Sequence, residues 1–423
     1  MTTRRVTRMP EIRAVGRRRI AVAAAAIAVT AVAACSNATG ATNSGAAGSA
    51  AIVIGTSLSL TGPLGALGTL EEAGYKQAVT DVNAVGGLSI GGTRRRVSLV
   101  ILDNQSNPAL ATQQSTQLIL KDGAVATLSG CTPTITVPEA LVAERDQVPM
   151  VANCTPVESF AGASPNGGWK YSWDLFFDEK NEAAMTAEAI ALQATNKKVA
   201  LFTDTEPDGA IERPLYKAAV QAAGFTIVGD YTFPVGTSDF SSFIDDARSQ
   251  GAQVVIAQTD PADGIALWKQ MKALSFTPKI AFSAKGAATG SFAAALGPVA
   301  EGTQTLAFWS AQEGYADSQH ILGTLGSKLK QPDLGIAVVA YSAAQVLLDA
   351  IGKAGSVDPG KINDAVGATS QTFPIGPVRF AANHTCATSL YVAQWQRGTV
   401  VQLVPRPASA AGTFEFPVPG LTG

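Results

Sequence analysis

Two segments of the chain place small polar residues and a cysteine at the start of an expected helix, an arrangement suited to holding a carboxylate. Each segment follows an apolar stretch and has Pro where the helix would begin. The first N–H groups of a helix are unpaired and carry partial positive charge, so such an end attracts anions. The alternative is that both segments only cap their helices, because caps and ligand donors share this geometry. The segments are Cys131-Thr132-Pro133-Thr134 and Asn153-Cys154-Thr155-Pro156.

Three cysteines, Cys131, Cys154 and Cys386, allow three single disulfide pairings in an oxidising compartment. If Cys131 and Cys154 lie at the carboxyl ends of neighbouring parallel strands, their Cα atoms come within the roughly 4.4–6.8 Å that a disulfide needs. This pair is therefore favoured, and the alternative is three buried thiols. The sequence contains no Cys-x-x-Cys or paired-histidine spacing, so we predict no metal site.

The residues that enzymes use for catalysis are sparse. The chain has two histidines, His320 and His384, and neither stands in a motif with a nucleophile. No Gly-x-Ser-x-Gly elbow is present. Asp103 and Asp204, at expected strand ends, could act as catalytic carboxylates, but such residues more often cap loops or line ligand clefts. We therefore predict that the chain is not an enzyme and uses no cofactor.

The first 34 residues predict an export signal. Seven arginines lie among residues 1–19, and the apolar run from Ile20 to Ala34 is shorter than the roughly 20 residues of a membrane span. The run ends in Val-Ala-Ala before Cys35, which resembles a lipobox and predicts acyl chains on Cys35. The alternative is an ordinary signal peptide with an incidental cysteine. Residues 35–50 are small and polar, and we expect a flexible tether there.

Strands and helices alternate along the rest of the chain, which predicts parallel sheets built from βαβ units. Two blocks of about 120 residues fit two lobes better than one very wide sheet. The fold class is therefore α/β, with two doubly wound parallel-sheet lobes. Irregular segments at Trp169–Asp178, Trp309–Gly314 and Phe373–Phe380 are candidate crossings between the lobes. The expected domains are 51–172 with 310–374 as lobe 1, 173–309 with 375–406 as lobe 2, and a loose C-terminal tail at 407–423.

The charge balance argues against a nucleic-acid partner. The chain has 423 residues, 15% of them charged, and a formal net charge of -2. Binding to phosphates needs a basic face, and like charges do not cluster outside the first twenty residues.

From Ile52 to about Arg406, the order of the elements resembles the leucine/isoleucine/valine-binding protein family, which comprises type I periplasmic binding proteins that serve ABC importers. No single motif is specific, but their joint order over most of the chain is. The motifs are Ser59-Leu60-Thr61-Gly62-Pro63, Ala73-Gly74-Tyr75-Lys76-Gln77-Ala78, Asp81-Val82-Asn83-Ala84-Val85-Gly86-Gly87, Leu102-Asp103-Asn104-Gln105, Asp239-Phe240-Ser241-Ser242-Phe243-Ile244 and Ile375-Gly376-Pro377-Val378-Arg379-Phe380.

The resemblance implies three crossings between the lobes and a ligand in the cleft, but the pocket positions depart from the family pattern. Leu67 and Asp208 stand where the family has aromatic residues, and the next such position falls at Thr259 or Asp260. Lys285 stands where the family has the acidic residue that holds an α-ammonium group. A lysine facing the ligand would repel an ammonium group and attract an anion. The alternatives are a solvated Lys285, or an ammonium group held by Asp208 or Asp260.

Together these features predict an exported, lipid-anchored solute-binding protein of an ABC importer, which captures an amino acid or a related carboxylate or amide by lobe closure. We expect a monomer on the outer face of the cytoplasmic membrane, with a small-molecule ligand, a permease complex and the membrane as partners. The alternative is a ligand-sensing lipoprotein ectodomain that signals to a membrane partner. The ligand is expected to differ from leucine. The candidate ligand-binding residues are Leu67, Thr132, Pro133, Thr134, Asn153, Thr155, Asp208, Thr259, Asp260 and Lys285.

Overall fold

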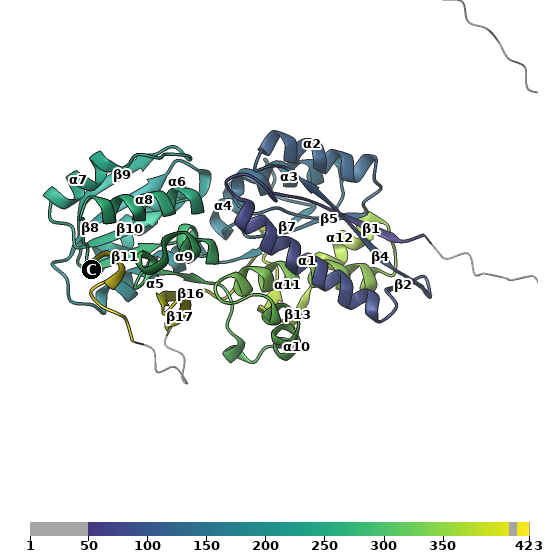
Figure 1. Ribbon diagram of the computed structural model, residues 1–423. Helices are drawn as coiled ribbons and strands as arrows, with labels where there is room; N and C mark the ends of the chain where they lie inside the picture. The colour runs from purple at the N-terminus through teal and green to yellow at the C-terminus, as the bar shows by residue number, and fades with distance from the viewer. Residues whose placement is uncertain (1–49, 406–412, 423) are drawn as a thin grey trace, which may run out of the picture. The chain divides into compact units, whose positions relative to one another are not determined.

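The computed structural model describes residues 50–405 and 413–422, which belong to one compact unit. The predicted signal peptide, the lipidation site Cys35 and all but the last residue of the predicted tether lie outside the described residues. The described part is built on two large sheets with helices on their faces, as Figure 1 shows.

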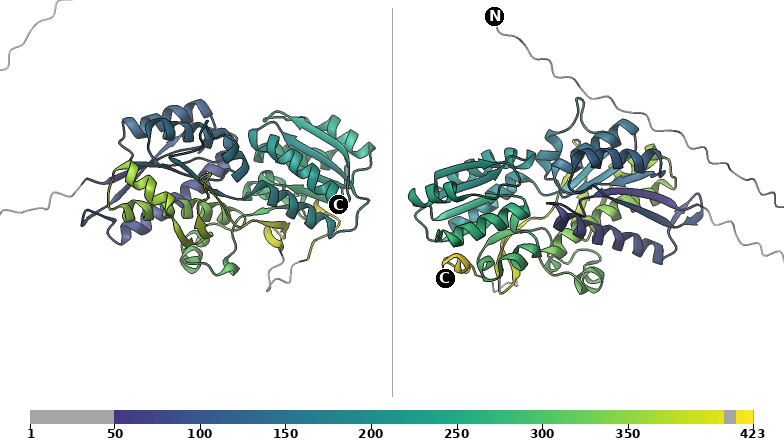
Figure 2. Two further views of the ribbon diagram at one scale, coloured as in Figure 1. Left: turned by 180° about the vertical axis from the view of Figure 1, so that it is seen from behind. Right: turned by 45° about the horizontal axis from the view of Figure 1, so that its top comes forward.

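The first sheet is parallel throughout. Its six strands follow the order β15 (Thr385–Ala387), β7 (Ser172–Phe176), β6 (Met150–Asn153), β5 (Ala126–Leu128), β1 (Ile52–Leu58) and β4 (Val97–Asp103). On one face α2 (Pro108–Leu120) packs against α3 (Pro133–Asp146), and on the other α1 (Gly65–Ala84) packs against α11 (Asp333–Ala354), as Figures 1 and 2 show. Smaller elements complete this lobe: α4 (Val157–Gly162), α10 (Ser318–Gly323), α12 (Pro359–Gly367), the 3-10 helices η3 (Ala311–Glu313) and η4 (Leu325–Ser327), and the hairpins β2 (Leu88–Ile90) with β3 (Thr93–Arg95) and β13 (Ser370–Phe373) with β14 (Gly376–Arg379).

The second sheet is parallel except in the pairings made by its last two strands in the chain, which are antiparallel. Its seven strands follow the order β17 (Thr399–Val404), β16 (Tyr391–Gln396), β12 (Gln304–Ala307), β11 (Ile280–Ser283), β10 (Val254–Gln258), β8 (Lys198–Asp204) and β9 (Thr226–Phe233). Its helices are α5 (Glu179–Ala191), α6 (Pro207–Ala222), α7 (Ser241–Ser249), α8 (Pro261–Ala273), α9 (Gly290–Leu296), α13 (Pro419–Thr422) and the 3-10 helices η1 (Lys285–Ala287) and η2 (Gly297–Ala300).

The strands of the second sheet are apolar on both sides because both of their faces are covered. Val199 and Leu201 belong to the core that also contains Tyr216 of α6, whereas Ala200 and Phe202 belong to the core that contains Trp268 of α8. Every residue of β10 is buried. This burial explains the near-continuous apolar runs in the sequence, which are typical of parallel sheets covered by helices.

The predicted architecture of two wound lobes is confirmed, but the sheet topology moves the predicted boundaries. β7 and β15 pair with each other in the first sheet, so lobe 2 starts after Phe177 rather than at residue 173, and it resumes near β16 rather than at residue 375. The segment Phe373–Phe380 is therefore not a crossing. Its prolines lie in and beside the hairpin of β13 and β14, after which the chain returns to the first sheet through β15. The chain crosses between the sheets after β7, after β12 and after β15 in the described ranges.

The end of the chain is more ordered than its composition predicts. Val418 and Leu421 are each 1% exposed and belong to a core of lobe 2, and α13 lies beside this lobe in Figure 2. The backbone N–H of Val418 donates to Lys279 O at 2.9 Å, and that of Gly420 donates to Glu301 O at 3.0 Å. The expectation of a loose tail is therefore wrong for residues 413–422, because two apolar side chains anchor a segment rich in Pro and Gly.

Among the described helices, α11 is long and apolar enough to cross a membrane, but 89% of its most apolar stretch is buried inside the protein, as befits a core helix.

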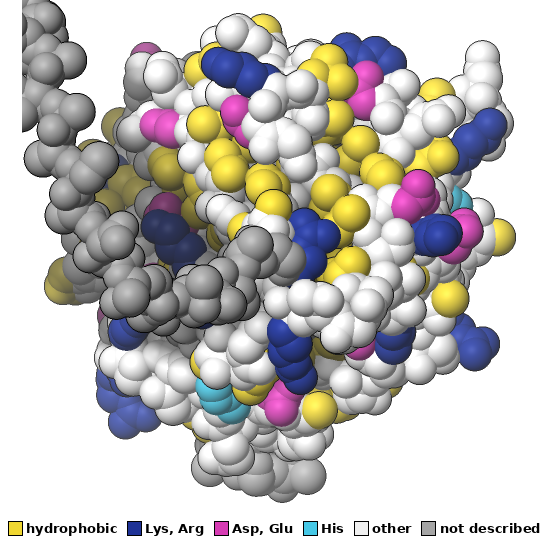
Figure 3. Space-filling model, turned by 90° about the vertical axis from the view of Figure 1, so that its right-hand side faces the viewer, with side chains coloured by type: hydrophobic (Ala, Val, Ile, Leu, Met, Phe, Trp, Pro, Cys, Tyr) yellow, Lys and Arg dark blue, Asp and Glu magenta, His cyan; other side chains and the backbone are white. Residues whose placement is uncertain are grey.

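The surface drawn in Figure 3 carries both signs of charge. Over the part that remains visible, acidic and basic side chains are interspersed with apolar ones.

The close packing of α1 on α11 makes Gly74 a sensitive position. A methyl group there would lie 2.7 Å from the backbone nitrogen of Tyr341 and 2.9 Å from the Cβ of Ala340. We predict that Gly74→Ala lowers the free energy of unfolding by about 1–3 kcal/mol, the usual cost of overpacking. The matched control is Gly323→Ala in α10, where a methyl group meets nothing within 4 Å. Urea denaturation of both variants tests this, and equal stability of the two would contradict it.

Candidate ligand-binding cleft

A cleft lined by both lobes lies beyond the carboxyl ends of the strands, where open α/β sheets bind ligands. Its walls enclose about 450 Å³ including the mouth, of which about 30 Å³ is wide enough for the centre of a water molecule. The cleft is therefore a narrow slot, and a solute of amino-acid size requires its walls to separate. Lobe 1 contributes Leu67, Cys131, Thr132, Cys154, Pro156, Phe176 and Ile336, and lobe 2 contributes Glu182, Asp208, Glu212, Gln258, Ala284, Lys285, Ala288 and Leu306.

Phenylalanine rings at two crossings form the apolar side of the cleft. Phe176 and Phe177 come from the end of β7 and the segment after it, and Phe308 follows β12. The ring centroid of Phe176 lies 4.6 Å from that of Phe177 and 5.0 Å from that of Phe308. All three side chains are at most 4% exposed and line the slot. The chain segments that connect the lobes therefore also supply the apolar surface between them.

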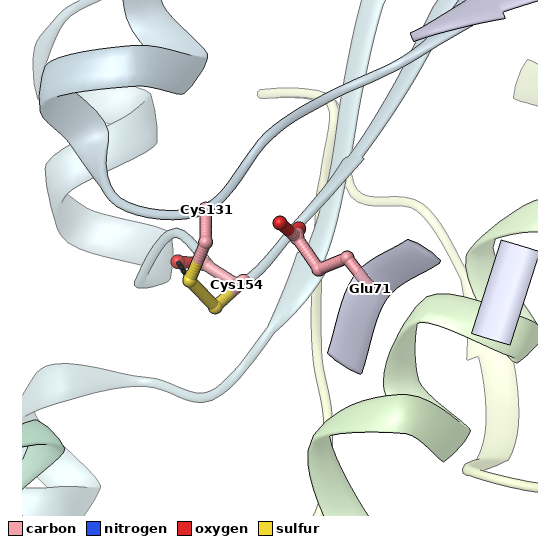
Figure 4. A group of neighbouring side chains, drawn as sticks. All are labelled: Glu71, Cys131 and Cys154. Atoms are coloured by element: carbon pink, nitrogen blue, oxygen red, sulfur yellow. Dashed lines mark hydrogen bonds between the residues drawn. A yellow bond between two sulfur atoms is a disulfide. The ribbon is translucent and has the colours of Figure 1, made fainter. Parts of the chain in front are cut away.

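A disulfide between Cys131 and Cys154 forms part of the lobe 1 wall, with their Cα atoms 4.9 Å apart. Thr132 and Cys154 have positive φ angles of 71° and 59°, which non-glycine residues rarely adopt. Figure 4 shows the carboxyl group of Glu71, from α1, pointing toward this disulfide. These three side chains lie close enough to hold an ion, but sulfurs joined to each other offer no thiolate ligands. Cys386 is a buried free thiol.

Buried carboxyl groups hold the loop that carries Cys131 and Thr132. The backbone N–H of Gly130 donates to Glu139 Oε2 at 2.8 Å, and the hydroxyl of Thr136 donates to Gly130 O at 2.6 Å. Burial, followed by the charge of Glu139, raises the pKa of Glu71 well above its usual range. The lobe 1 wall is therefore fixed from behind by polar groups that do not themselves reach the cleft.

Only some of the predicted ligand-binding residues of lobe 1 lie at the cleft. Leu67 and Thr132 line the cleft, and Thr134 lies next to it, where its hydroxyl donates to Glu206 Oε1 of lobe 2 at 3.0 Å. Pro133 is buried as the first residue of α3 and is not a lining residue. The other two predicted residues point into lobe 1. Asn153 is fully buried and hydrogen-bonds the hydroxyl of Tyr75, and Thr155 donates to Thr136 Oγ1 at 2.7 Å.

One of the two predicted anion-binding helix starts is occupied by the protein itself. The carboxyl group of Glu179 accepts from the backbone N–H groups of Glu158 at 2.6 Å and Ser159 at 3.1 Å, both in the first turn of α4. This helix start after Thr155 therefore does attract a carboxyl group, as its geometry requires. That group comes from α5 rather than from a ligand, and the expectation of a ligand site there is wrong.

Lys285 is buried among carboxylates rather than facing a ligand alone. Its side chain is 14% exposed, and its ammonium group lies 3.0 Å from oxygens of Glu206, Asp208 and Asp260 and 3.4 Å from Asp204. We call these five residues the Lys285 cluster. The hypothesis that Lys285 attracts an anionic ligand is wrong, because four carboxyl groups already surround its charge. Thr259 is fully buried and lies against Gly264 and Gly286 rather than in the cleft.

The charges within the Lys285 cluster shift one another. Burial alone would lower the pKa of Lys285, but the charges of Asp204, Asp208, Asp260 and Glu206 outweigh it and raise the pKa well above its usual range. Burial also raises the pKa of Asp204 to about 7, despite the opposing attraction of Lys285. The ammonium group is therefore held in its charged form, while the carboxyl group of Asp204 resists ionisation.

A second acidic group, Glu182 of α5 and Glu212 of α6, lies beside the cluster and lines the cleft. Glu182 accepts from the hydroxyl of Tyr216 at 2.6 Å, and burial raises its pKa to about 7. Glu212 is 1% exposed, and neither of its carboxyl oxygens accepts a hydrogen bond from an N–H or hydroxyl group of the described residues; its carboxyl group meets that of Glu182. Burial and the charge of Glu182 raise the pKa of Glu212 well above its usual range.

The sequence offered a signal for this second acidic group that the motif comparison did not use. Asp208, Glu212, Tyr216 and Val220 repeat every four residues and form one buried stripe of α6. An acidic pair on a stripe that continues into Tyr and Val predicts buried carboxyl groups, because positions four apart share a helix face. No such signal marks Phe308, which a crossing segment places in the cleft.

Comparison with known proteins identifies the fold family. A family model described as periplasmic binding protein matches residues 51–399. This chain belongs to the periplasmic binding protein family. Its relatives include Leu/Ile/Val-binding protein homolog 3 of Brucella melitensis, which is 26% identical over 313 residues that span 74% of this chain and 82% of the relative. The leucine/isoleucine/valine-binding branch predicted from the order of motifs is thereby confirmed.

Solved structures of similar proteins support the same fold. A branched-chain amino acid transporter substrate-binding protein of Streptococcus pneumoniae, in complex with isoleucine, superposes with a TM-score of 0.72 at 21% identity and covers 83% of this chain and 99% of its own. A solute-binding protein of an ABC transporter from R. palustris, in complex with benzoate, gives a TM-score of 0.72 at 22% identity and covers 84% and 95%.

Membership of the periplasmic binding protein family defines the general activity. Members of the family are extracytoplasmic proteins that bind small solutes for ABC transporters and are not enzymes. The strand-end carboxylate Asp204 accordingly has a structural role here, because it pairs with Lys285 instead of standing ready for catalysis.

Without the ammonium group of Lys285, the buried carboxylates of the cluster should destabilise the folded protein. We predict that Lys285→Met lowers the free energy of unfolding at pH 8 by about 3–5 kcal/mol, the usual effect of breaking a buried ion pair. Burial already raises the pKa values of Asp204, Glu206 and Asp260 in the folded state, and they should rise further without Lys285. The folded variant then holds protons that the unfolded chain has lost, so its stability falls as the pH rises from about 5 to 8.

Chemical denaturation at pH 5.5 and pH 8 measures both effects. The difference in stability between the original protein and Lys285→Met should be smaller at pH 5.5. The control is Lys269→Met at an exposed position of α8. A variant as stable as this control at both pH values would show that the cluster contributes no net stability.

Proposed function

We propose that this periplasmic binding protein is a lipid-anchored receptor that captures an amino acid or a related small polar solute and delivers it to an ABC permease. The observation that carries the proposal is the slot whose opposite walls come from two lobes joined by three crossings. Because the slot is narrower than such a solute, binding has to involve separation and closure of the walls. A hinge between two rigid lobes is a common way to achieve this motion.

The chemistry of the walls supports a solute with both polar and apolar parts. Thr132 Oγ1 of lobe 1 and Gln258 Oε1 of lobe 2 are buried without partners among the described residues, and both side chains line the slot. Buried polar atoms without partners are costly, so a ligand that pairs with them gains affinity. The phenylalanine rings supply the apolar contact. The relatives are named for leucine, isoleucine and valine, and the similar structures contain isoleucine or benzoate.

The hydroxyl of Thr132 offers a test of the binding site with little structural risk. We predict that Thr132→Val weakens binding of the solute about 3- to 10-fold, the value of one hydrogen bond, and leaves the unfolding midpoint unchanged or higher. A thermal-shift screen of small metabolites would first identify the solute, since a ligand at 100 times its Kd adds roughly 2.7 kcal/mol to stability. Calorimetry on the variant then measures the loss.

The control for this test is Thr80→Val on the exposed side of α1. Equal affinity of Thr132→Val and the original protein would remove Thr132 from the site. A screen across amino acids, amines, amides and organic acids in which no compound raises the midpoint would contradict the receptor function.

The lipid anchor is proposed from the small residues before Cys35. We predict that Cys35→Ala abolishes incorporation of labelled palmitate in cells and releases the protein from the membrane fraction. More than one acyl chain is needed for stable attachment, so release should be nearly complete. The purified soluble part of the variant should bind its solute with unchanged affinity. Labelling that persists in Cys35→Ala would contradict the anchor.

A further inference from the structure

Glu212 stands out among the buried groups of the cleft because no N–H or hydroxyl group donates to it. It lines the slot, is 1% exposed, and neither oxygen accepts a hydrogen bond from an N–H or hydroxyl group of a described residue. Oε2 of Glu182, which also lines the slot, lacks such a donor as well, and the two carboxyl groups hydrogen-bond each other when one of them is protonated. Two adjacent carboxyl groups that open onto a ligand cleft are costly to bury unless they retain a proton or a positive charge meets them.

The neighbours of Glu212 do not supply that positive charge. The charged and titratable groups that face it are Glu179 and Glu182 on α5, Asp208 and Tyr216 on α6, and Lys285 on η1. Lys285 is the one cation in this set, and its ammonium group is held within 3.4 Å of four other carboxylates. When this pair loses its proton, the lobe 2 wall has an excess of negative charge, which no described lobe 1 lining residue offsets.

We infer that the solute carries net positive charge and that its ammonium or guanidinium group binds between Glu212 and Glu182. This inference rests on the proposed function and names the class of solute. The cationic group donates to both carboxyl groups and takes the place of the proton that they otherwise retain. Charge-assisted hydrogen bonds of this kind are about twice as strong as neutral ones.

The rest of the slot sets the size and character of the solute. Opposite the acidic wall lie the rings of Phe176, Phe177 and Phe308 together with Leu67 and Ile336. These side chains favour a short aliphatic or aromatic body, and aromatic rings tolerate a nearby cation. An anion without an amino group would meet the uncompensated carboxyl groups and be repelled. The structure thus favours amines with an apolar body over branched-chain amino acids and organic acids.

Two matched series of probes test the charge of the solute on constant skeletons. The aromatic series is phenethylamine, L-phenylalanine and 3-phenylpropanoate, and the aliphatic series is isoamylamine, L-leucine and 4-methylpentanoate. Calorimetry at pH 7 should show that the amine binds roughly tenfold or more tightly than the zwitterion in at least one series, with the anion weakest. Agmatine and L-arginine extend the comparison to guanidinium groups.

Charge-neutral variants then locate the site. Glu212→Gln should weaken amine binding roughly tenfold or more, and Glu182→Gln should have an effect of the same sign. Glu188→Gln, at an exposed position of α5, is the matched control and should bind as the original protein does. Because the amine displaces a proton, its apparent binding enthalpy should vary with the ionisation enthalpy of the buffer, and Glu212→Gln should reduce this variation. Unfolding midpoints of both variants establish that they fold.

The outcomes separate this inference from the proposed function. Tighter binding of the zwitterions or anions than of any cationic probe would overturn the inference and leave the receptor function intact. Amine binding that is unaffected in both folded variants would also overturn it. If no probe and no compound of the metabolite screen binds, the receptor function and the inference fail together.

Discussion

The ion cluster around Lys285 is the interaction on which the lobe 2 side of the cleft depends. An ammonium group held within 3.4 Å of four carboxylates ties together the end of β8, the starts of α6 and α8, and η1 after β11. These segments meet because β10 pairs with β8 on one side and with β11 on the other, which brings the carboxyl ends of all three strands to one edge of the sheet. The burial of four carboxyl groups is tolerated because one ammonium group attracts all of them and because burial raises the pKa of Asp204 to about 7.

Local sequence at the helix starts explains why carboxyl groups gather around Lys285. Thr132, Glu206 and Asp260 each directly precede the proline that begins α3, α6 or α8, and none of the three side chains caps its own helix. Proline disfavours the helical backbone conformation in the residue before it, so Glu206 and Asp260 are extended and stand just outside their helices. The side chains of Glu206 and Asp260 are thereby available to Lys285, and that of Thr132 remains available to a solute.

The sequence predicted the alternation of elements, the two lobes and the family, because apolar periodicity and motif order depend on local chemistry. It also favoured the pairing of Cys131 with Cys154, which the structure contains. It could not predict the surroundings of Lys285, since its partners come from positions 204, 206, 208 and 260, which only the sheet brings together. The same limit explains the boundary near residue 375, where two prolines indicated a crossing and the chain instead forms a hairpin and adds β15 to the first sheet.

Glu206 contacts both Lys285 in lobe 2 and Thr134 in lobe 1, so its ionisation is coupled to closure of the lobes. One carboxyl oxygen lies 3.0 Å from the ammonium group of Lys285, and the other accepts from the hydroxyl of Thr134 in lobe 1 at 3.0 Å. Burial raises the pKa of Glu206, and closure of the slot increases that burial, so closure and ionisation oppose each other unless a cation is enclosed. A positively charged solute relieves this conflict and favours the closed arrangement. An anion adds to it, because its charge has to enter a wall that already holds more carboxylates than cations. The charge of the solute therefore acts on binding through Glu182 and Glu212 and on lobe closure through Glu206, and Lys285 neighbours both sets of carboxyl groups.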